Sequence, residues 1–245
     1  MIFAAGIGSR LKPFTDHHPK ALVEVGEQPM LGRVIRNMEN AGIRHIVINV
    51  HHFATQIIDY ISSNNWNADI RISDETALLA DTGGGIGKAA PLLLPDEPVL
   101  LHNADIYTDL NLQKFISDYK SADSDALLAV SDRQSSRMLF FDNSMMLKGW
   151  QNIKTGETRP DGFAPATYHT PLAFSGIHII SPKIVAMLDA MAKQTMVFSI
   201  TPFYVENANL LNIKGLKIPE NTAWFDVGKP ETLAAARQFA KSIHP

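Results

Sequence analysis

The chain opens with MIFAAGIGSR, residues 1–10, in which an apolar run leads directly into a glycine-rich turn. This pattern is typical of a buried strand that delivers a polar loop to the edge of a sheet. Four β-branched or apolar runs continue the pattern, and segments of helical spacing separate them. The runs lie at residues 45–50, 68–73, 98–102 and 126–130, and the helical segments at 31–38, 54–62, 86–93 and 110–121. Such alternation predicts βαβ units and an α/β fold with a doubly wound, mostly parallel but mixed, Rossmann-like sheet.

The pattern changes after residue 130. Residues 137–141 and 145–150 flank Asp142-Asn143-Ser144, which predicts a β-hairpin, and residues 155–172 form a long loop rich in Pro and Gly. Further strands are expected at 175–180, 210–218 and 223–226, with helices at 182–192, 201–206 and 230–243. We expect one domain over residues 1–245, whose second half extends the sheet and forms a smaller β-rich lid over its carboxyl edge.

Composition excludes several classes of protein. Hydrophobic residues make up 45% of the 245 residues and charged residues 19%, which is ordinary for a globular chain. A net charge of −3 argues against a nucleic-acid partner. There is no cysteine, no apolar run long enough for a membrane helix, and no basic leader before the first apolar residues. These features predict a cytoplasmic protein without a membrane partner.

Polar residues follow three of the expected strands. The turn Gly6–Arg10 follows the first strand, Asp105 follows residues 98–102, and Asp226 follows Trp224-Phe225. In an open α/β sheet, ligands bind outside the carboxyl ends of the strands. We therefore expect these three features to converge on one edge of the sheet.

Two common nucleotide-binding motifs do not fit. A dinucleotide fold would have a third glycine at position 11, where this chain has Leu11. The stretch Gly83–Lys88 ends in Gly-Lys like a P-loop, but Thr82 stands in place of the first glycine and Ala89 in place of the hydroxyl residue.

The longer string Gly6-x-Gly8-x-Arg10-x-x-Pro13-x-Thr15-x-x-x-Pro19-Lys20 remains. It resembles the signature of the sugar-phosphate nucleotidyltransferases. The resemblance implies a nucleotide-diphospho-sugar transferase fold, with a nucleotide-binding half at residues 1–130 and a sugar-phosphate-binding half with a closing helix at 131–245. It also implies transfer of a nucleoside monophosphate from an NTP to a sugar-1-phosphate, with release of pyrophosphate. Arg10 would brace the leaving phosphates with its bidentate fork, and Lys20 would supply a point charge.

The resemblance assigns the remaining site residues. It implies a Mg²⁺ ion between Asp105 and Asp226, and these two carboxylates act with Arg10 and Lys20 as the catalytic set. Nucleotide contacts are expected from Ala4, Ala5, Gly6, Gly8, Arg10, Lys20, Gly83, Gly84 and Asp105, and sugar contacts from Asn152 and Gly176. Ala104 departs from the family's usual glycine before Asp105. The family's Glu-Lys-Pro sugar motif is also missing, and Gly149-Trp150-Gln151-Asn152 stands in its place.

Length and loop motifs look most like those of the N-acetylmuramate-1-phosphate uridylyltransferases of cell-wall recycling, which implies UTP and N-acetylmuramate-1-phosphate as substrates. Mannose-1-phosphate guanylyltransferases and glucose-1-phosphate thymidylyl- or uridylyltransferases are the alternatives, as are cytidylyltransferases that act on phosphocholine or on seven-carbon sugar phosphates. A catalytically silent relative is disfavoured, because Arg10, Lys20, Asp105 and Asp226 are all present. A monomer or a homodimer is expected, with the apolar hairpin at 139–147 as the surface that could pair with a second subunit.

Overall fold

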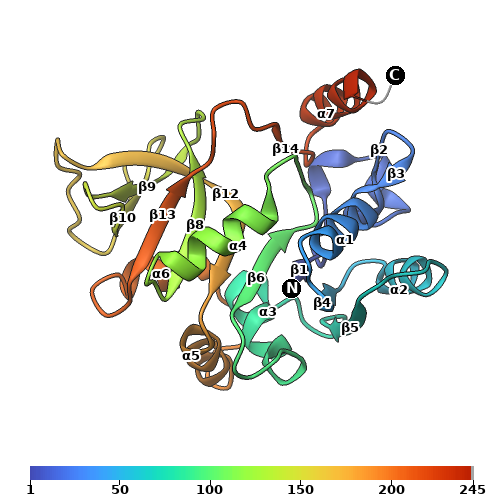
Figure 1. Ribbon diagram of the computed structural model, residues 1–245, viewed down its shortest axis with the longest axis horizontal. Helices are drawn as coiled ribbons and strands as arrows, with labels where there is room; N and C mark the ends of the chain where they lie inside the picture. Colours follow the sequence, from blue (N-terminus) through green and yellow to red (C-terminus); the bar gives the residue numbers. More distant parts are fainter. Residues whose placement is uncertain (244–245) are drawn as a thin grey trace.

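The computed structural model describes residues 1–243 and is built on a ten-stranded mixed sheet with helices on both faces (Figure 1). The strands of this sheet are β1 (Ile2–Phe3), β4 (His45–Val50), β5 (Asp69–Asp74), β6 (Val99–Asn103), β8 (Ala126–Ser131), β9 (Arg137–Phe141), β10 (Leu147–Asn152), β11 (Thr158–Arg159), β12 (Thr170–Ile180) and β13 (Ile213–Lys217). The α-helices are α1 (Met30–Asn40), α2 (Ala54–Ser62), α3 (Asp81–Ala89), α4 (Leu112–Ser121), α5 (Pro182–Ala192), α6 (Ile200–Glu206) and α7 (Pro230–Ile243). Two small ribbons pair β2 (Glu24–Val25) with β3 (Gln28–Pro29) and β7 (Ile106–Thr108) with β14 (Trp224–Asp226).

The predicted α/β fold is confirmed. Strands β5, β4, β1 and β6 pair in parallel in that order, as βαβ units require. Strand β12 is antiparallel to both β6 and β8, and β13 is parallel to β8. The sheet thus runs without interruption from the first half of the chain into the second. The carboxyl ends of β1, β4, β6 and β8 lie at one edge.

Alternating side chains on the strands fill two cores. Ile46 and Ile48 point into the layer formed with α1, α2 and α4, whereas Val47 between them points into the layer formed with α3, α5 and α6. Strands buried on both faces read as continuous apolar runs, which explains the sequence pattern at 45–50. A third, smaller cluster joins α7 to the β2–β3 ribbon at the upper right of Figure 1.

Three local expectations are corrected. The glycines at 83–85 do not precede a helix but lie inside α3, which begins at Asp81. The loop at 155–172 contains β11, and β12 already begins at Thr170. Three apolar residues of the β9–β10 hairpin, expected as part of a surface for a second subunit, are engaged within the chain. Leu139, Phe141 and Leu147 are at most 3% exposed, because they pack against the chain's own second core.

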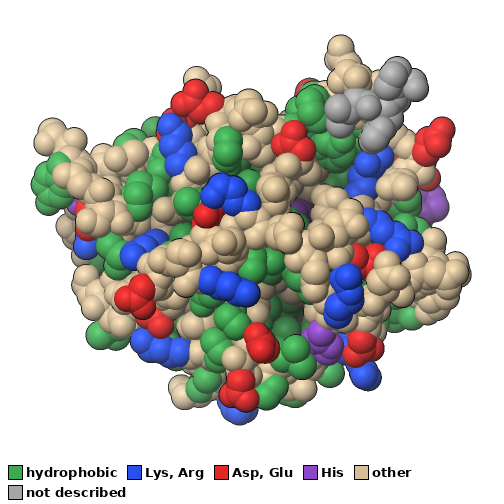
Figure 2. Space-filling view, in the orientation of Figure 1, with side chains coloured by type: hydrophobic (Ala, Val, Ile, Leu, Met, Phe, Trp, Pro, Cys, Tyr) green, Lys and Arg blue, Asp and Glu red, His purple; other side chains and the backbone are tan. Residues whose placement is uncertain are grey.

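Of the helices that the structure describes, none combines the length and the apolarity needed to cross a bilayer. Acidic and basic side chains are interspersed over the face shown in Figure 2.

Two histidines lie inside the sheet, where their imidazoles are about 1% exposed. His178 Nδ1 is 2.6 Å from the Tyr204 hydroxyl, and His102 Nδ1 is 2.8 Å from the Asn103 carbonyl. Burial lowers the pKa of His102 to about 4 and that of His178 to about 3. Both imidazoles are therefore neutral in the folded chain at neutral pH.

This burial predicts a loss of stability in mild acid. Below pH 6.5, the ordinary pKa of histidine, the unfolded chain binds protons that the folded chain does not, so the free energy of unfolding falls as pH falls. Between pH 7 and pH 5 we expect a loss of about 2 kcal/mol for each buried histidine. Urea unfolding at pH 7, 6 and 5 measures this slope. The buried amino group of Met1, whose pKa burial lowers to about 5, contributes to the same slope, so His178→Gln should remove about a third of it. The exposed His17→Gln is the control, and an unchanged slope in His178→Gln would contradict this explanation.

Candidate active site

The three polar features singled out in the sequence meet at the carboxyl edge of the sheet, as predicted. Lys20 Nζ donates to Asp105 Oδ2 and is 3.7 Å from Asp226 Oδ1. Arg10 Nη2 is 3.9 Å from Asp226 Oδ2. Four charged residues therefore form one group, although Asp105 and Asp226 are far from Lys20 along the chain. We call this group the Lys20 cluster; its members are Arg10, Lys20, Asp105 and Asp226.

The β7–β14 ribbon brings the two carboxylates together. Strand β14 is antiparallel to β7, with Asp226 opposite Ile106, the residue that follows Asp105. The Val227 amide also donates to the Asp105 carbonyl at 2.9 Å. The register of this short pair therefore fixes the spacing of the carboxylates.

Close packing around Lys20 explains why the signature has these residue types at these positions. A Cβ atom on Gly8 would lie 2.8 Å from Lys20 Cβ and 2.9 Å from Thr15 Cγ2, and Gly8 has a φ of +70° that favours glycine. The Thr15 hydroxyl donates to the Gly8 carbonyl at 2.9 Å. Gly8, Thr15 and Lys20 form one packed unit that holds the buried stem of Lys20.

Gly228 is needed on the other side of the cluster. A Cβ atom there would lie 2.5 Å from Lys20 Nζ, 2.7 Å from Asp226 Oδ1 and 2.9 Å from Arg10 Nη2. The Gly228 amide donates to Asp226 Oδ1 at 2.8 Å. The glycine thus leaves room for both cations and orients one carboxylate.

The cluster suits a magnesium ion that shares its coordination with substrate. Within residues 1–243 no third acidic or histidine side chain joins Asp105 and Asp226 to complete a metal-binding group. Mg²⁺ commonly binds through one or two carboxylates, with phosphate oxygens and water supplying the other ligands. The Lys20 ammonium lies between the two carboxylates, at a place that already favours positive charge.

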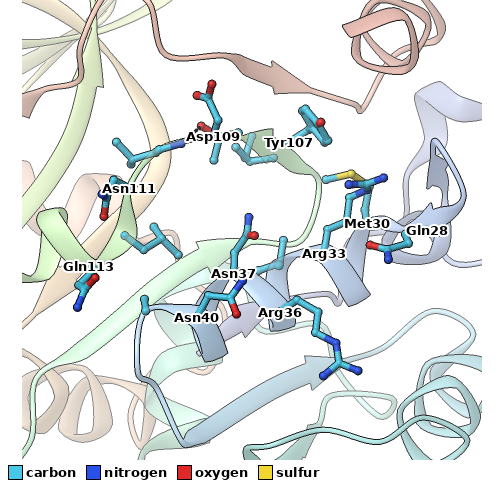
Figure 3. Close-up of a pocket in the computed structure, with 16 residues that line it drawn as sticks. Gln28, Met30, Arg33, Arg36, Asn37, Asn40, Tyr107, Asp109, Asn111 and Gln113 are labelled. Atoms are coloured by element: carbon cyan, nitrogen blue, oxygen red, sulfur yellow. Dashed lines mark hydrogen bonds between the residues drawn. The ribbon is translucent and has the colours of Figure 1, made fainter. Parts of the chain in front are cut away.

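A cleft of about 420 Å³ opens beside the cluster and is the candidate nucleotide site. Ala4, Ala5 and Gly6 line it together with Lys20 and Asp105. A second cleft, of about 360 Å³, lies between α1 and residues 106–113 (Figure 3). Its lining includes no member of the Lys20 cluster. Its two arginines are engaged by the chain itself, since Arg33 donates to the Val25 carbonyl and Arg36 to the Asn65 carbonyl. The first cleft therefore suits a phosphorylated ligand better.

A buried network under the nucleotide cleft was not foreseen in the sequence. Asn49 Oδ1 accepts from the Ala4 amide at 2.8 Å, and Asn49 Nδ2 donates to Glu75 Oε1 at 2.8 Å. The Ala80 amide donates to Glu75 Oε2 at 3.0 Å. Asn49 and Glu75 are at most 3% exposed, and both line the cleft. They tie the end of β1 to the segment before α3, so they set the width of the cleft.

Gly83 and Gly84 have a packing role in this structure. Both amides donate to the Phe198 carbonyl, at 2.9 and 3.1 Å, so they are already engaged. A Cβ atom on either glycine would collide with the segment 196–198. Asp81 and Thr82, the two residues before them, line the cleft instead.

The two expected sugar ligands lie in different surroundings. Gly176 has a φ of +75° and lies against Asn103, next to the carboxylates, since a Cβ atom there would be 2.8 Å from Asn103 Nδ2. Asn152 lies at the end of β10, where its side-chain oxygen accepts from the Lys154 amide at 3.1 Å. The structure thus brings Gly176 beside the predicted metal ligands and gives Asn152 a role in closing a turn.

The Asn49 network predicts a linked effect on stability and nucleotide binding. Asn49→Ala leaves the Ala4 amide and one Glu75 oxygen without their buried partner, at a cost of about 2–3 kcal/mol. The NTP KM should also rise, because Ala4 borders the cleft. Urea unfolding and steady-state kinetics test this, with Asn40→Ala on the exposed face of α1 as the control. If Asn49→Ala behaved like that control, the network would not hold the cleft in shape.

Comparison with known proteins assigns the family. The nucleotidyl transferase family model matches residues 1–242. The chain is similar to an N-acetylmuramate alpha-1-phosphate uridylyltransferase of Caulobacter vibrioides, with 30% identity over 99% of this chain and 97% of the relative. It is also similar to a mannose-1-phosphate guanyltransferase of Yarrowia lipolytica, with 25% identity over 94% of this chain and 61% of the relative.

The fold agrees with this assignment. HddC from Yersinia pseudotuberculosis complexed with GMP-PN superimposes with a TM-score of 0.75 at 23% identity, covering 98% of this chain and 97% of HddC. With a match over nearly its whole length, and with the signature residues packed around one cleft, the chain belongs to the nucleotidyl transferase family.

Proposed function

We propose that the protein transfers a uridylyl group from UTP to N-acetylmuramate-1-phosphate, forming the UDP-sugar and pyrophosphate. The observation that carries the reaction type is the Lys20 cluster at the mouth of the nucleotide cleft. The choice of substrates is supported by the full-length similarity to the uridylyltransferase of Caulobacter vibrioides. Mannose-1-phosphate with GTP is the second candidate, because guanyltransferases are also among the relatives.

The reaction is an in-line displacement. An oxygen of the acceptor phosphate attacks the α-phosphorus of the NTP, and the bond to the β-phosphate oxygen breaks. A sugar phosphate is largely a dianion near neutral pH, since the second pKa of a phosphate monoester is about 6, so the attack needs no general base. The protein's task is therefore to align the two phosphates and neutralise their charge.

Arg10 and Lys20 carry the positive charge for this task. Lys20 is 8% exposed and held by Gly8 and Thr15, so its ammonium is well positioned. The Arg10 side chain is 55% exposed and can turn toward the leaving phosphates. A guanidinium offers two parallel donors to phosphate oxygens, whereas an ammonium acts as a point charge.

Asp105 and Asp226 are the residues that would hold Mg²⁺. When bound, the ion neutralises phosphate charge as it builds up in the transition state. The Gly228 amide holds Asp226 in place, and the β7–β14 register does the same for Asp105.

Removing either metal-binding carboxylate should abolish turnover without unfolding the chain. Asp105→Asn and Asp226→Asn keep the side-chain shape but remove charge worth several kcal/mol in the transition state, so kcat should fall by about 10² or more. Pyrophosphate release at saturating Mg²⁺ measures the rate, and thermal unfolding checks the fold. Asp59→Asn, on the exposed face of α2, is the control. Near-normal turnover by either site variant would refute the metal assignment.

A substrate matrix tests the proposed pair. Pyrophosphate release is measured for UTP, GTP, dTTP and CTP, each with the 1-phosphates of N-acetylmuramate, glucose and mannose. UTP with N-acetylmuramate-1-phosphate should have the highest kcat/KM. An advantage of about tenfold for another acceptor, equal to ~1.4 kcal/mol, would overturn the acceptor assignment, and an equal advantage for another base would overturn UTP. A protein that releases no pyrophosphate with any pair would refute the activity itself.

A further inference from the structure

The order of the strands divides the carboxyl edge into two sides. The nucleotide cleft lies over β1 and β4, and Asp105 follows β6. Next to β6 come β12 and then β8. The nucleotide cleft occupies the side of Asp105 toward β1 and β4. A second substrate that reaches Asp105 from the opposite side of β6 must therefore lie over the ends of β12 and β8.

Arg133 lies at that place, two residues after β8 ends. Its Nη2 donates to the Phe174 carbonyl at 2.6 Å, and its guanidinium carbon is 4.1 Å from the centroid of the Trp224 ring. Trp224 Nε1 in turn donates to the Ser175 carbonyl at 2.9 Å. These contacts hold the Arg133 guanidinium against Trp224 of β14, the strand that ends at Asp226.

An irregularity in β12 makes these contacts possible. The register of β12 against β8 shifts between Phe174 and His178, and Gly176 within the shift has a φ of +75°. A bulge of this kind leaves some residues without hydrogen bonds to the neighbouring strand, and their backbone groups point in new directions. Here the carbonyls of Phe174 and Ser175 are taken by Arg133 and Trp224.

The charge of Arg133 has no counter-ion of its own. Among residues 1–243 it forms no ion pair with a carboxylate, and the adjacent Asp132 pairs with Lys217 instead. Its Nε is buried and has no partner. Burial lowers the pKa of Arg133, and the charge of Asp226 opposes that shift. A half-buried cation without a paired carboxylate is costly, and a bound anion would reduce that cost.

Space for a ligand is available beside the guanidinium. A cavity of about 370 Å³ is lined by Arg133, Trp224, Ser131 and Thr222. Lys217 also lines it, together with its two carboxylate partners, Asp132 and Glu220. In the neighbouring β9–β10 hairpin, Trp150 to Asn152 are uncharged, Lys148 is paired with Asp142, and Arg137 is exposed at the start of β9. Arg159 of β11 is paired with Glu157.

We propose that the Arg133 guanidinium, held over Trp224 and tied to the β12 bulge, binds the phosphate of the acceptor sugar phosphate. Arg133 would then supply, from the loop after β8, the positive charge that residues 150–152 lack. The inference rests on the proposed reaction but not on the identity of the sugar or the base.

The test compares Arg133→Met with Arg71→Met, a matched control in which an exposed arginine of β5 is replaced. Pyrophosphate release is measured with the acceptor varied at saturating UTP, and with UTP varied at saturating acceptor. N-acetylmuramate-1-phosphate is the first acceptor, and the best acceptor of the substrate matrix replaces it if another is preferred. Arg133→Met should raise the acceptor KM at least about tenfold and leave the UTP KM within about twofold, and the control should change neither.

Two further measurements separate binding from positioning. Calorimetric titration of N-acetylmuramate-1-phosphate, with Mg²⁺ and a non-hydrolysable UTP analogue present, should show the same loss of affinity. Arg133→Lys, which keeps the charge, should show a smaller loss and also serves if Arg133→Met does not fold.

Equal acceptor affinity in the wild type and both Arg133 variants would overturn the proposal while leaving the function intact. A fall in kcat alone, reproduced by Trp224→Phe, would also overturn it, because Arg133 would then act through Asp226. Absence of turnover with every substrate pair would instead refute the proposed function, and absence of acceptor binding by the wild type would refute both.

Discussion

The structure of the site depends on one electrostatic arrangement, in which the Lys20 ammonium lies between the carboxylates of Asp105 and Asp226. Lys20 comes from the first loop, Asp105 from the end of β6 and Asp226 from the β14 ribbon, so the arrangement forms only after the sheet and the ribbon have assembled. Gly8 and Gly228 are glycines because a Cβ atom at either position would strike Lys20. Within the signature of the first loop, Gly8 and Thr15 are thus explained by the packing of Lys20, whereas a Cβ atom on Gly6 would meet nothing within 4 Å.

Much of the fold follows from local pattern. Helices α2, α5 and α7 have the bounds that the sequence predicts, because apolar spacing and the terminal residues agree for each of them. The central strands are equally clear, since both faces of β4 are buried and Ile46 to Ile48 form a continuous apolar run. The convergence of Asp105 and Asp226 could be predicted from their places after two apolar runs, but its cause could not, because Asp226 reaches Asp105 through the separate β7–β14 ribbon and not through the main sheet.

Features that depend on contacts between distant segments could not be predicted. Gly83 and Gly84 give a turn signal in the sequence, but the backbone of 196–198 passes so close to them that only glycine fits within α3. Asn49 carries no motif, and its role appears only when Ala4 and Glu75 are placed beside it. In the sequence, Arg133 is only one basic residue in a polar loop. Its role appears when the structure places it beside the Phe174 carbonyl at the bulge of β12. In each case the information lies in a pairing between strands or loops, which periodicity along the chain does not contain.

The same arrangement links the metal to the nucleotide. Under the proposed function, Mg²⁺ and the Lys20 ammonium compete for the same two carboxylates, because both are cations and both carboxylates lie within 4 Å of Lys20 Nζ. The β- and γ-phosphates of the NTP offer Lys20 alternative partners of the same charge as Asp105. An NTP that drew the ammonium toward its phosphates would leave Asp105 and Asp226 free to hold the ion, which would supply positive charge beside those phosphates. Binding of each then favours binding of the other, and by linkage the coupling free energy must be equal in both directions.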